Sequence, residues 1–250
     1  MGDILKCKLI VAYDGTEYSG WQVQTNAPTV QKAVQDAVES SFGKRYSVTG
    51  CSRTDSGVHA KAFCCAVDFK DDNVSIPVDK IPIVMNRYLP VDVSVLNAEF
   101  KDDSFHPRYD VVYKEYEYLI WNSPIRNVFL NNRAFCYPKT LDEKLMSDAA
   151  DYFVGKHDFA GFMSVGSSVE DTVREIKYFT VRREGDRVII NVAADGFLYN
   201  MVRILVGTLI EVSERKIAVG DIPEIIASKN RKNAGFTAPP EGLYLSKVVY

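Results

Sequence analysis

The stretch TVREIKYFTVRREGDRVIINVAADG, residues 172–196, limits the possible folds of this chain more than any other part of the sequence. Two runs rich in β-branched and aromatic residues flank the triplet Glu184-Gly185-Asp186, an arrangement that predicts a β-hairpin. The next residues, FLYNMVRILVGTLIEV (197–212), are strongly apolar and repeat with a helical period. The chain therefore needs an antiparallel sheet and a helix that packs on it, which indicates an α+β fold.

Strands and helices are interspersed along the first hundred residues. Alternating and then continuous apolar residues predict a strand over 7–15 that ends at the turn Asp14-Gly15. Pro28-Thr29 begins a helix whose apolar residues keep helical spacing up to residue 42. Further strands are predicted over 46–54, 60–69 and 93–100, and a further helix within 77–90.

The second half shows a similar set of elements. VVYKEYEYLIWN (111–122) has high β propensity and places Tyr116 and Tyr118 on one face. Helices are predicted over 137–155, 197–212 and 222–229, and a closing strand over 242–250. We therefore expect two similar α+β domains, 1–105 and 106–250, each an antiparallel-rich sheet with helices on one face.

The composition excludes several classes of protein. No apolar run approaches the roughly twenty residues that a membrane-spanning helix needs, so no membrane partner is expected. The first residues, MGDILKCKLIVAYDG, lack the small-residue cleavage site of a secretory signal, which favours a cytoplasmic location. The five cysteines contain no CxxC pair and there are only three histidines, so neither a disulfide framework nor a metal site is expected.

The charge gives little support for nucleic acid as a partner. The net charge is −3 and the isoelectric point about 5.7, whereas phosphate contacts need Lys and Arg. Two local basic clusters exist, and we interpret both as solvated faces. They consist of Lys229, Arg231 and Lys232, and of Arg182, Arg183 and Arg187.

The stretch GCSRTDSGVHA (50–60) lies between two predicted strands. Asp55 followed by Ser56-Gly57 is ordinary turn chemistry, because Asp bonds nearby backbone and Gly accepts a positive φ. Taken alone, Asp55 is a turn residue. A functional interpretation needs partners from elsewhere in the chain.

Two such partners are possible. Arg203 lies amid strongly apolar helical sequence and either reaches solvent or needs an anionic partner, for which Asp55 is a candidate. Tyr116 is either a core residue or a tyrosine at the edge of a cleft that stacks on a nucleobase.

A different motif, VAYDGT (11–16), raises a phosphatase hypothesis. Haloacid-dehalogenase phosphatases carry D-x-D-G-T, in which the first Asp is the nucleophile, but that position here is Ala12. We reject the hypothesis and interpret Asp14-Gly15 as a turn at the end of a strand.

Seven motifs in this order resemble the TruA-type family of tRNA pseudouridine synthases along essentially the whole chain. They are YDGTEYSGWQVQ, VQKAVQDA, SRTDSGVHA, YKEYEYLIWN, GKHDFAGF, FLYNMVRILVGTLIEV and AGFTAPPEGLYLSKVVY. The resemblance implies two α+β domains whose sheets meet around a positively charged cleft. It also implies a homodimer that binds tRNA, needs no metal or organic cofactor, and converts uridine to pseudouridine at positions 38, 39 and 40 of the anticodon stem-loop.

The resemblance also implies roles for single residues. The family's essential aspartate falls on Asp55, and the arginine two before it falls on Arg53. The tyrosine that packs on the target base falls on Tyr116, and the arginine that pairs with the aspartate falls on Arg203. Ser52 and Ser56 stand where the family has Gly and Ala, so we expect Ser52 to avoid a positive φ.

The chemistry fits these residue types. Pseudouridine formation breaks the N1–C1′ bond and rejoins the base through C5, and it needs one ionised carboxylate. That carboxylate either attacks C1′ or removes the C2′ proton. Two alternatives to this function stay open at this point: a synthase for another tRNA site or RNA, and a tRNA-binding module without activity.

Overall fold

A computed structural model describes residues 6–69, 74–166 and 169–250. The contacts between Cα atoms divide the chain into two compact units. Unit 1 contains residues 1–112 and 245–250, and unit 2 contains residues 113–244. These limits differ from the predicted domains in two segments, because 106–112 and the C-terminal 245–250 belong to unit 1. The Val112 N–H donates to the Val249 carbonyl (2.8 Å), which helps to explain why these two segments stay together.

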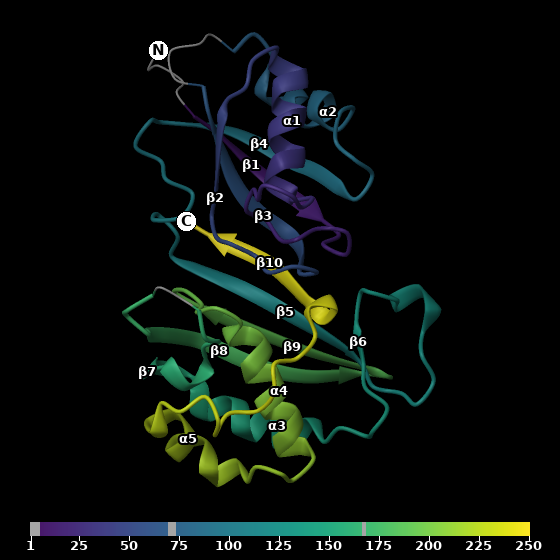
Figure 1. Cartoon of the computed structure of the whole chain (residues 1–250), viewed down its shortest axis with the longest axis vertical. Helices are drawn as coiled ribbons and strands as arrows, with labels where there is room; N and C mark the ends of the chain where they lie inside the picture. Colours follow the sequence, from purple (N-terminus) through teal and green to yellow (C-terminus); the bar gives the residue numbers. More distant parts are fainter. Residues whose placement is uncertain (1–5, 70–73, 167–168) are drawn as a thin grey trace. The chain divides into compact units, whose positions relative to one another are not determined.

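Unit 1 has the predicted order of strand, helix, two strands, helix and strand (Figure 1). Its sheet has the strand order β4-β1-β3-β10, and β2 pairs with β3. The pairs β1–β3, β1–β4 and β2–β3 are all antiparallel. The elements are β1 (Lys6–Tyr13), α1 (Val30–Phe42), β2 (Ser47–Gly50), β3 (His59–Asp68), α2 (Ile81–Met85), β4 (Val93–Lys101) and the closing strand β10 (Leu243–Val249).

The burial patterns in unit 1 follow the sequence patterns that predicted them. In β1 every second residue is buried, as expected for a strand with one face in the core. In α1 the buried side chains are Val30, Val34, Ala37 and Val38, which form one helical stripe. The helix ends at Gly43, whose φ of 72° lets its N–H donate to the Glu39 carbonyl.

Unit 2 is built on the predicted hairpin (Figure 1). β8 and β9 pair antiparallel around Gly185, β5 pairs with β9, β7 pairs with β8, and the short β6 runs parallel to β5. The helix α3 packs against β8 and α4. The elements are β5 (Tyr113–Trp121), β6 (Phe135–Cys136), α3 (Glu143–Ala150), β7 (Gly155–Asp158), β8 (Val173–Glu184), β9 (Arg187–Ala194), α4 (Met201–Ser213) and α5 (Ile222–Ser228). The α+β class is thus confirmed.

Two predicted helices begin later than their apolar periodicity indicates, and the one predicted over 137–155 also ends early, at Ala150, because a 3-10 turn follows and Gly155 begins β7. The helix expected from Tyr137 begins at Glu143, because Asn122 donates to the carbonyls of Tyr137 (2.9 Å) and Lys139 (2.6 Å) and holds that segment outside the helix. Asp142 then caps the helix by accepting from the Leu145 N–H. The helix expected from Phe197 begins at Met201, because Asn200 has a φ of 60°.

The five cysteines are free thiols, and four of them (Cys7, Cys51, Cys64 and Cys65) are buried. Burial raises the pKa of Cys7 and of Cys64 to about 12. Both faces of β3 are covered, so the adjacent Cys64 and Cys65 are buried on opposite sides of the strand. No helix in the described part of the chain has the length and apolar character that crossing a bilayer requires.

We expect a small aromatic disulfide reagent to modify one thiol per folded chain rapidly, namely the exposed Cys136. The other four thiols are shielded by packing. Burial raises the pKa of Cys7, Cys64 and Cys65, which keeps these three in the unreactive protonated form. Spectrophotometric titration should therefore show one fast equivalent in buffer and five in concentrated urea. Two or more fast equivalents in the folded protein would contradict the burial described here.

Candidate active site

The predicted catalytic aspartate lies in the connection between β2 and β3 of unit 1. Asp55 is half-buried, Thr54 before it is buried, and Arg53 is exposed. The Val58 N–H donates to the Asp55 carbonyl (3.2 Å), and Gly57 has a φ of 76°. These features define a tight turn with glycine at its third position. Asp55 is therefore the first residue of this turn, and the predicted bend at Ser56-Gly57 is confirmed.

The two serines of this connection are accommodated differently. Neither Ser52 nor Ser56 has a positive φ, as expected for Ser52. The Ser56 hydroxyl donates to the Tyr18 carbonyl (3.3 Å), whereas the buried Ser52 hydroxyl oxygen has no hydrogen-bond partner. A buried hydroxyl without a partner costs free energy, because it loses its bonds to water and gains none.

Ser52→Ala should therefore leave the free energy of unfolding unchanged or raise it by up to about 1 kcal/mol. Thr208→Val is the matched control, because the buried Thr208 hydroxyl donates to the Ile204 carbonyl (2.8 Å) and accepts from the Gly235 N–H (3.0 Å). Loss of that bonded hydroxyl should cost about 1–3 kcal/mol. Urea unfolding of both variants measures the difference. A larger loss for Ser52→Ala than for Thr208→Val would show that the Ser52 hydroxyl is satisfied in solution.

Tyr116 lies on β5 in unit 2, opposite Val192 of β9. It is 7% exposed, and its ring meets that of Phe197 edge-on, with the ring centroids 5.1 Å apart. Tyr118 on the same face is fully buried and its hydroxyl donates to the Pro239 carbonyl (2.7 Å). Tyr116 is thus a mostly buried tyrosine whose ring orientation is set by an aromatic neighbour.

Arg203 lies in the first turn of α4 and is half-buried. Its Nε donates to the Ala238 carbonyl (2.6 Å), and its Nη1 donates to Asn200 Oδ1 (2.8 Å). The Asn200 amide in turn donates to the Ser164 hydroxyl (2.9 Å). The Arg203 guanidinium is therefore held by two groups in unit 2, which fixes where its positive charge lies within that unit.

The four predicted site residues are thus divided between the two units. Arg53 and Asp55 lie in one loop of unit 1, while Tyr116 and Arg203 lie on β5 and α4 of unit 2. Asp55 and Arg203 belong to different units, so their pairing stays a prediction. In the described ranges, no group of three or more His, Cys, Asp or Glu side chains is placed to hold a metal ion.

The two basic clusters make contacts inside unit 2. Arg183 donates to Glu143 (3.0 Å) and to the Leu141 carbonyl (2.8 Å). Arg231 donates to the Gly235 carbonyl (2.8 Å), and Lys229 pairs with Asp158 (2.7 Å). These cations help to join segments of unit 2 to one another.

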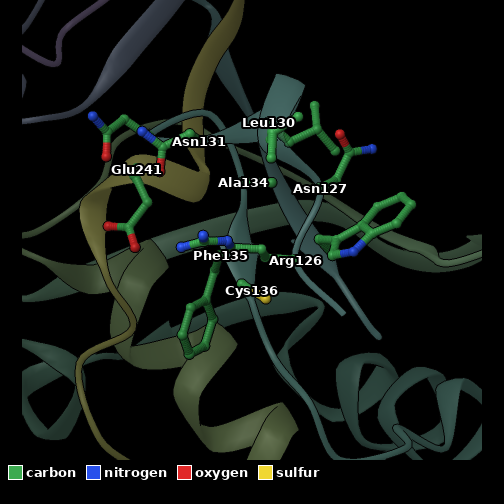
Figure 2. Close-up of a pocket in the computed structure, with 11 residues that line it drawn as sticks. Arg126, Asn127, Leu130, Asn131, Ala134, Phe135, Cys136 and Glu241 are labelled. Atoms are coloured by element: carbon green, nitrogen blue, oxygen red, sulfur yellow. The ribbon is translucent and has the colours of Figure 1, made fainter. Parts of the chain in front are cut away.

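Unit 2 also contains a pocket of about 480 Å³ beside the segment that leads into β6 (Figure 2). The Arg126 side chain extends toward Glu241 in this view. None of the four predicted site residues belongs to its lining, so the pocket is separate from the site proposed below. It is lined by Trp121, Arg126, Asn127, Val128, Leu130, Asn131, Asn132, Ala134, Phe135, Cys136 and Glu241.

Comparison with known proteins decides the family. A family model described as tRNA pseudouridine synthase matches residues 9–110 and 149–250. The chain belongs to the tRNA pseudouridine synthase family. The first matched segment includes Arg53 and Asp55 and the second includes Arg203, whereas Tyr116 lies between the two.

Individual relatives match the synthase over nearly its whole length. The tRNA pseudouridine synthase A of Acetivibrio thermocellus is 46% identical over 243 residues, which are 97% of this chain and 98% of that protein. The protein of the same name from Ruminiclostridium cellulolyticum is 45% identical, over 98% of this chain and 99% of its own. That from Thermoanaerobacter sp. (strain X514) is 43% identical, over 97% and 98%. The chain is therefore a pseudouridine synthase, an isomerase, and the resemblance read from the sequence is confirmed.

Proposed function

We propose that this synthase converts uridine to pseudouridine in the anticodon stem-loop of tRNA, at positions 38, 39 and 40, with Asp55 as its catalytic carboxylate. The observation that carries the proposal is that the segment matched by the tRNA pseudouridine synthase family, 9–110, includes the turn that begins at Asp55. A half-buried carboxylate at such a turn is accessible to substrate and yet fixed by the backbone on either side.

The reaction exchanges one glycosidic bond for another. The N1–C1′ bond breaks, the uracil turns, and a C5–C1′ bond forms; the hydrogen on C5 leaves as a proton and N1 gains one. The carboxylate of Asp55 starts the reaction either by attack on C1′ or by removal of the C2′ proton. Both routes require Asp55 to be ionised at neutral pH.

The other three residues act around this carboxylate in the proposal. The Arg203 guanidinium keeps Asp55 ionised when substrate excludes water, since a nearby positive charge lowers the pKa of a carboxyl group. Tyr116 supports the uracil after it has left the helical stack, because a base inside a stem cannot be reached. Arg53, which is exposed next to the turn, contacts a phosphate beside the flipped nucleotide.

The assembly is part of the same proposal. We infer a cytoplasmic homodimer that binds tRNA, in which basic side chains gather at the RNA-binding surface although the net charge is −3. Strong dependence of tRNA affinity on salt concentration would accompany such a local concentration of positive charge.

Mapping of pseudouridine in transcribed tRNA tests the position. Transcripts with a single uridine at 38, 39 or 40, and cytidine at the other two, are treated with the synthase and then with a carbodiimide that marks pseudouridine for primer extension. A stop at each single uridine is expected, and none in a transcript with cytidine at all three. Modification only elsewhere in the tRNA would refute the anticodon assignment and keep the isomerase, whereas binding without any modification would indicate a binding module.

A further inference from the structure

The segment 13–21, which leads from β1 toward α1, contacts residues before and after Asp55, the first residue of the turn 55–58 (the Asp55 turn). Both segments belong to unit 1. Contacts before Asp55 are made to Thr54, and contacts after it are made to Gly57, Val58 and His59. The position of the carboxylate therefore depends on a segment about forty residues earlier in the chain.

On the side before Asp55, a buried hydroxyl pair joins the two segments. The Tyr13 hydroxyl and Thr54 Oγ1 are 2.8 Å apart, and these residues are 5% and 8% exposed. The Trp21 N–H also donates to the Thr54 carbonyl (3.3 Å). The residue directly before Asp55 is thus held through both its side chain and its backbone.

On the side after Asp55, backbone groups of the segment 13–21 contact both backbone and side-chain groups. The Gly57 N–H donates to the Tyr18 carbonyl (3.2 Å), and the Gly15 N–H donates to Nδ1 of the buried His59 (2.9 Å). A Cβ atom on Gly15 would lie 2.0 Å from the Val58 carbonyl oxygen, so only glycine permits this approach.

Hydrogen bonds to Asp92 hold the segment 13–21 in place. The Tyr18 hydroxyl donates to Asp92 Oδ1 (2.7 Å), and the Asp14 N–H donates to the Asp92 carbonyl (2.9 Å). A Cβ on Gly20, whose φ is 88°, would lie 2.3 Å from the Thr54 carbonyl oxygen. The segment therefore has little freedom to shift without moving the turn that carries Asp55.

We propose that Tyr13 and Thr54 are positioning residues for the reaction, and that their hydroxyl pair sets where the Asp55 carboxylate meets the ribose. The inference rests on the function proposed above, since it assigns a role relative to the catalytic Asp55. Neither residue touches the reacting atoms in this assignment; both act through the backbone of the turn. Small displacements of a catalytic group lower the rate sharply, because the reacting atoms must approach within about 3–3.5 Å.

Single-turnover kinetics of four variants tests this role. Tyr13→Phe and Thr54→Val each remove one hydroxyl and keep the shape of the side chain. Each should lower the rate constant about tenfold with tRNA affinity unchanged within twofold, and the double variant should be no slower than either single one. Thr54→Ser restores the hydroxyl and should recover most of the rate.

A control separates positioning from stability. Tyr250→Phe also removes a tyrosine hydroxyl in unit 1, which donates to the Pro107 carbonyl (2.7 Å) and interacts with Cys64, and neither of these residues belongs to the turn 55–58. It should cost similar stability and leave the rate unchanged. If Tyr13→Phe and Tyr250→Phe react equally fast, or if the losses of Tyr13→Phe and Thr54→Val add up, the positioning role is refuted.

Hydrogen exchange of the peptide 51–58 tests the same contact without any reaction. Exchange in this peptide should be faster in Tyr13→Phe than in wild type and unchanged in Tyr250→Phe; unchanged exchange in Tyr13→Phe would contradict the proposal. A wild-type protein that makes no pseudouridine would refute the proposed function instead, and the exchange result would still decide whether Tyr13 holds the turn.

Discussion

Asp55→Asn should abolish pseudouridine formation, with a single-turnover rate at least about 10³-fold below wild type and tRNA affinity within a few fold. The amide keeps the size of the side chain but can neither attack C1′ nor remove the C2′ proton. The turn itself should persist, because its described hydrogen bond uses the Asp55 backbone carbonyl and its conformation depends on Gly57. Stopped reactions with excess enzyme give the rate, and filter binding gives the affinity.

Asp79→Asn is the matched control for this substitution. It removes one negative charge from unit 1 at an exposed site where Asp79 pairs with Lys80. Rate and affinity should both match wild type within a factor of about two, because exposed ion pairs contribute little. Asp55→Asn with a rate close to that of Asp79→Asn would exclude Asp55 as the catalytic carboxylate.

Arg203→Ala should lower turnover about a hundredfold or more, and tRNA affinity far less. The proposed reason is that without the guanidinium the carboxyl group of Asp55 takes up a proton when the substrate displaces water, since desolvation disfavours its charged form. The rate of Arg203→Ala should therefore rise with pH over a range in which the wild-type rate is already constant. Arg203→Lys should recover part of the rate, because it restores the charge but not the fork of donors that now reaches Ala238 and Asn200.

Arg183→Ala controls for the loss of a structural arginine from unit 2. Arg183 is also partly buried and also donates to a backbone carbonyl, that of Leu141. Both variants should lose stability, but only Arg203→Ala should lose turnover. An equal loss of rate and affinity in Arg203→Ala would indicate that Arg203 serves in RNA binding and not in keeping Asp55 ionised.

Local patterns in the sequence predicted most of the fold. The hairpin around Gly185 and the order of elements in unit 1 were correct because alternation, helical spacing and turn residues act over a few neighbours. The starts of α3 and α4 were wrong, because they depend on Asn122, which is distant from α3 in the sequence, and on the positive φ of Asn200. Apolar spacing carries no information about either.

In the candidate site, too, local features could be predicted and contacts between distant residues could not. The sequence indicated both the turn at Asp55 and the family to which the chain belongs, and the structure and the comparisons confirm them. Asp14-Gly15 was predicted only as the turn at the end of a strand. The strand does end at Tyr13, but the hydrogen-bonded turn begins at Gly15, whose carbonyl accepts from the Tyr18 N–H (3.0 Å). What the spacing could not indicate is that Gly15 approaches Val58 and that Tyr13 bonds to Thr54, since both contacts join residues more than forty positions apart.

Release of tritium from C5 is the measurement that tests the proposed reaction most directly. A tRNA transcript with C5-tritiated uridine at position 39 alone is incubated with the purified chain, without added cofactor, and with Asp55→Asn in parallel. Wild type should release one tritium into water for each pseudouridine formed, because the C5–C1′ bond displaces the C5 hydrogen, and Asp55→Asn should release none. Release by Asp55→Asn at the wild-type rate would contradict the assignment of Asp55 as the catalytic carboxylate. No release by wild type would contradict the assignment of position 39 of tRNA as a substrate.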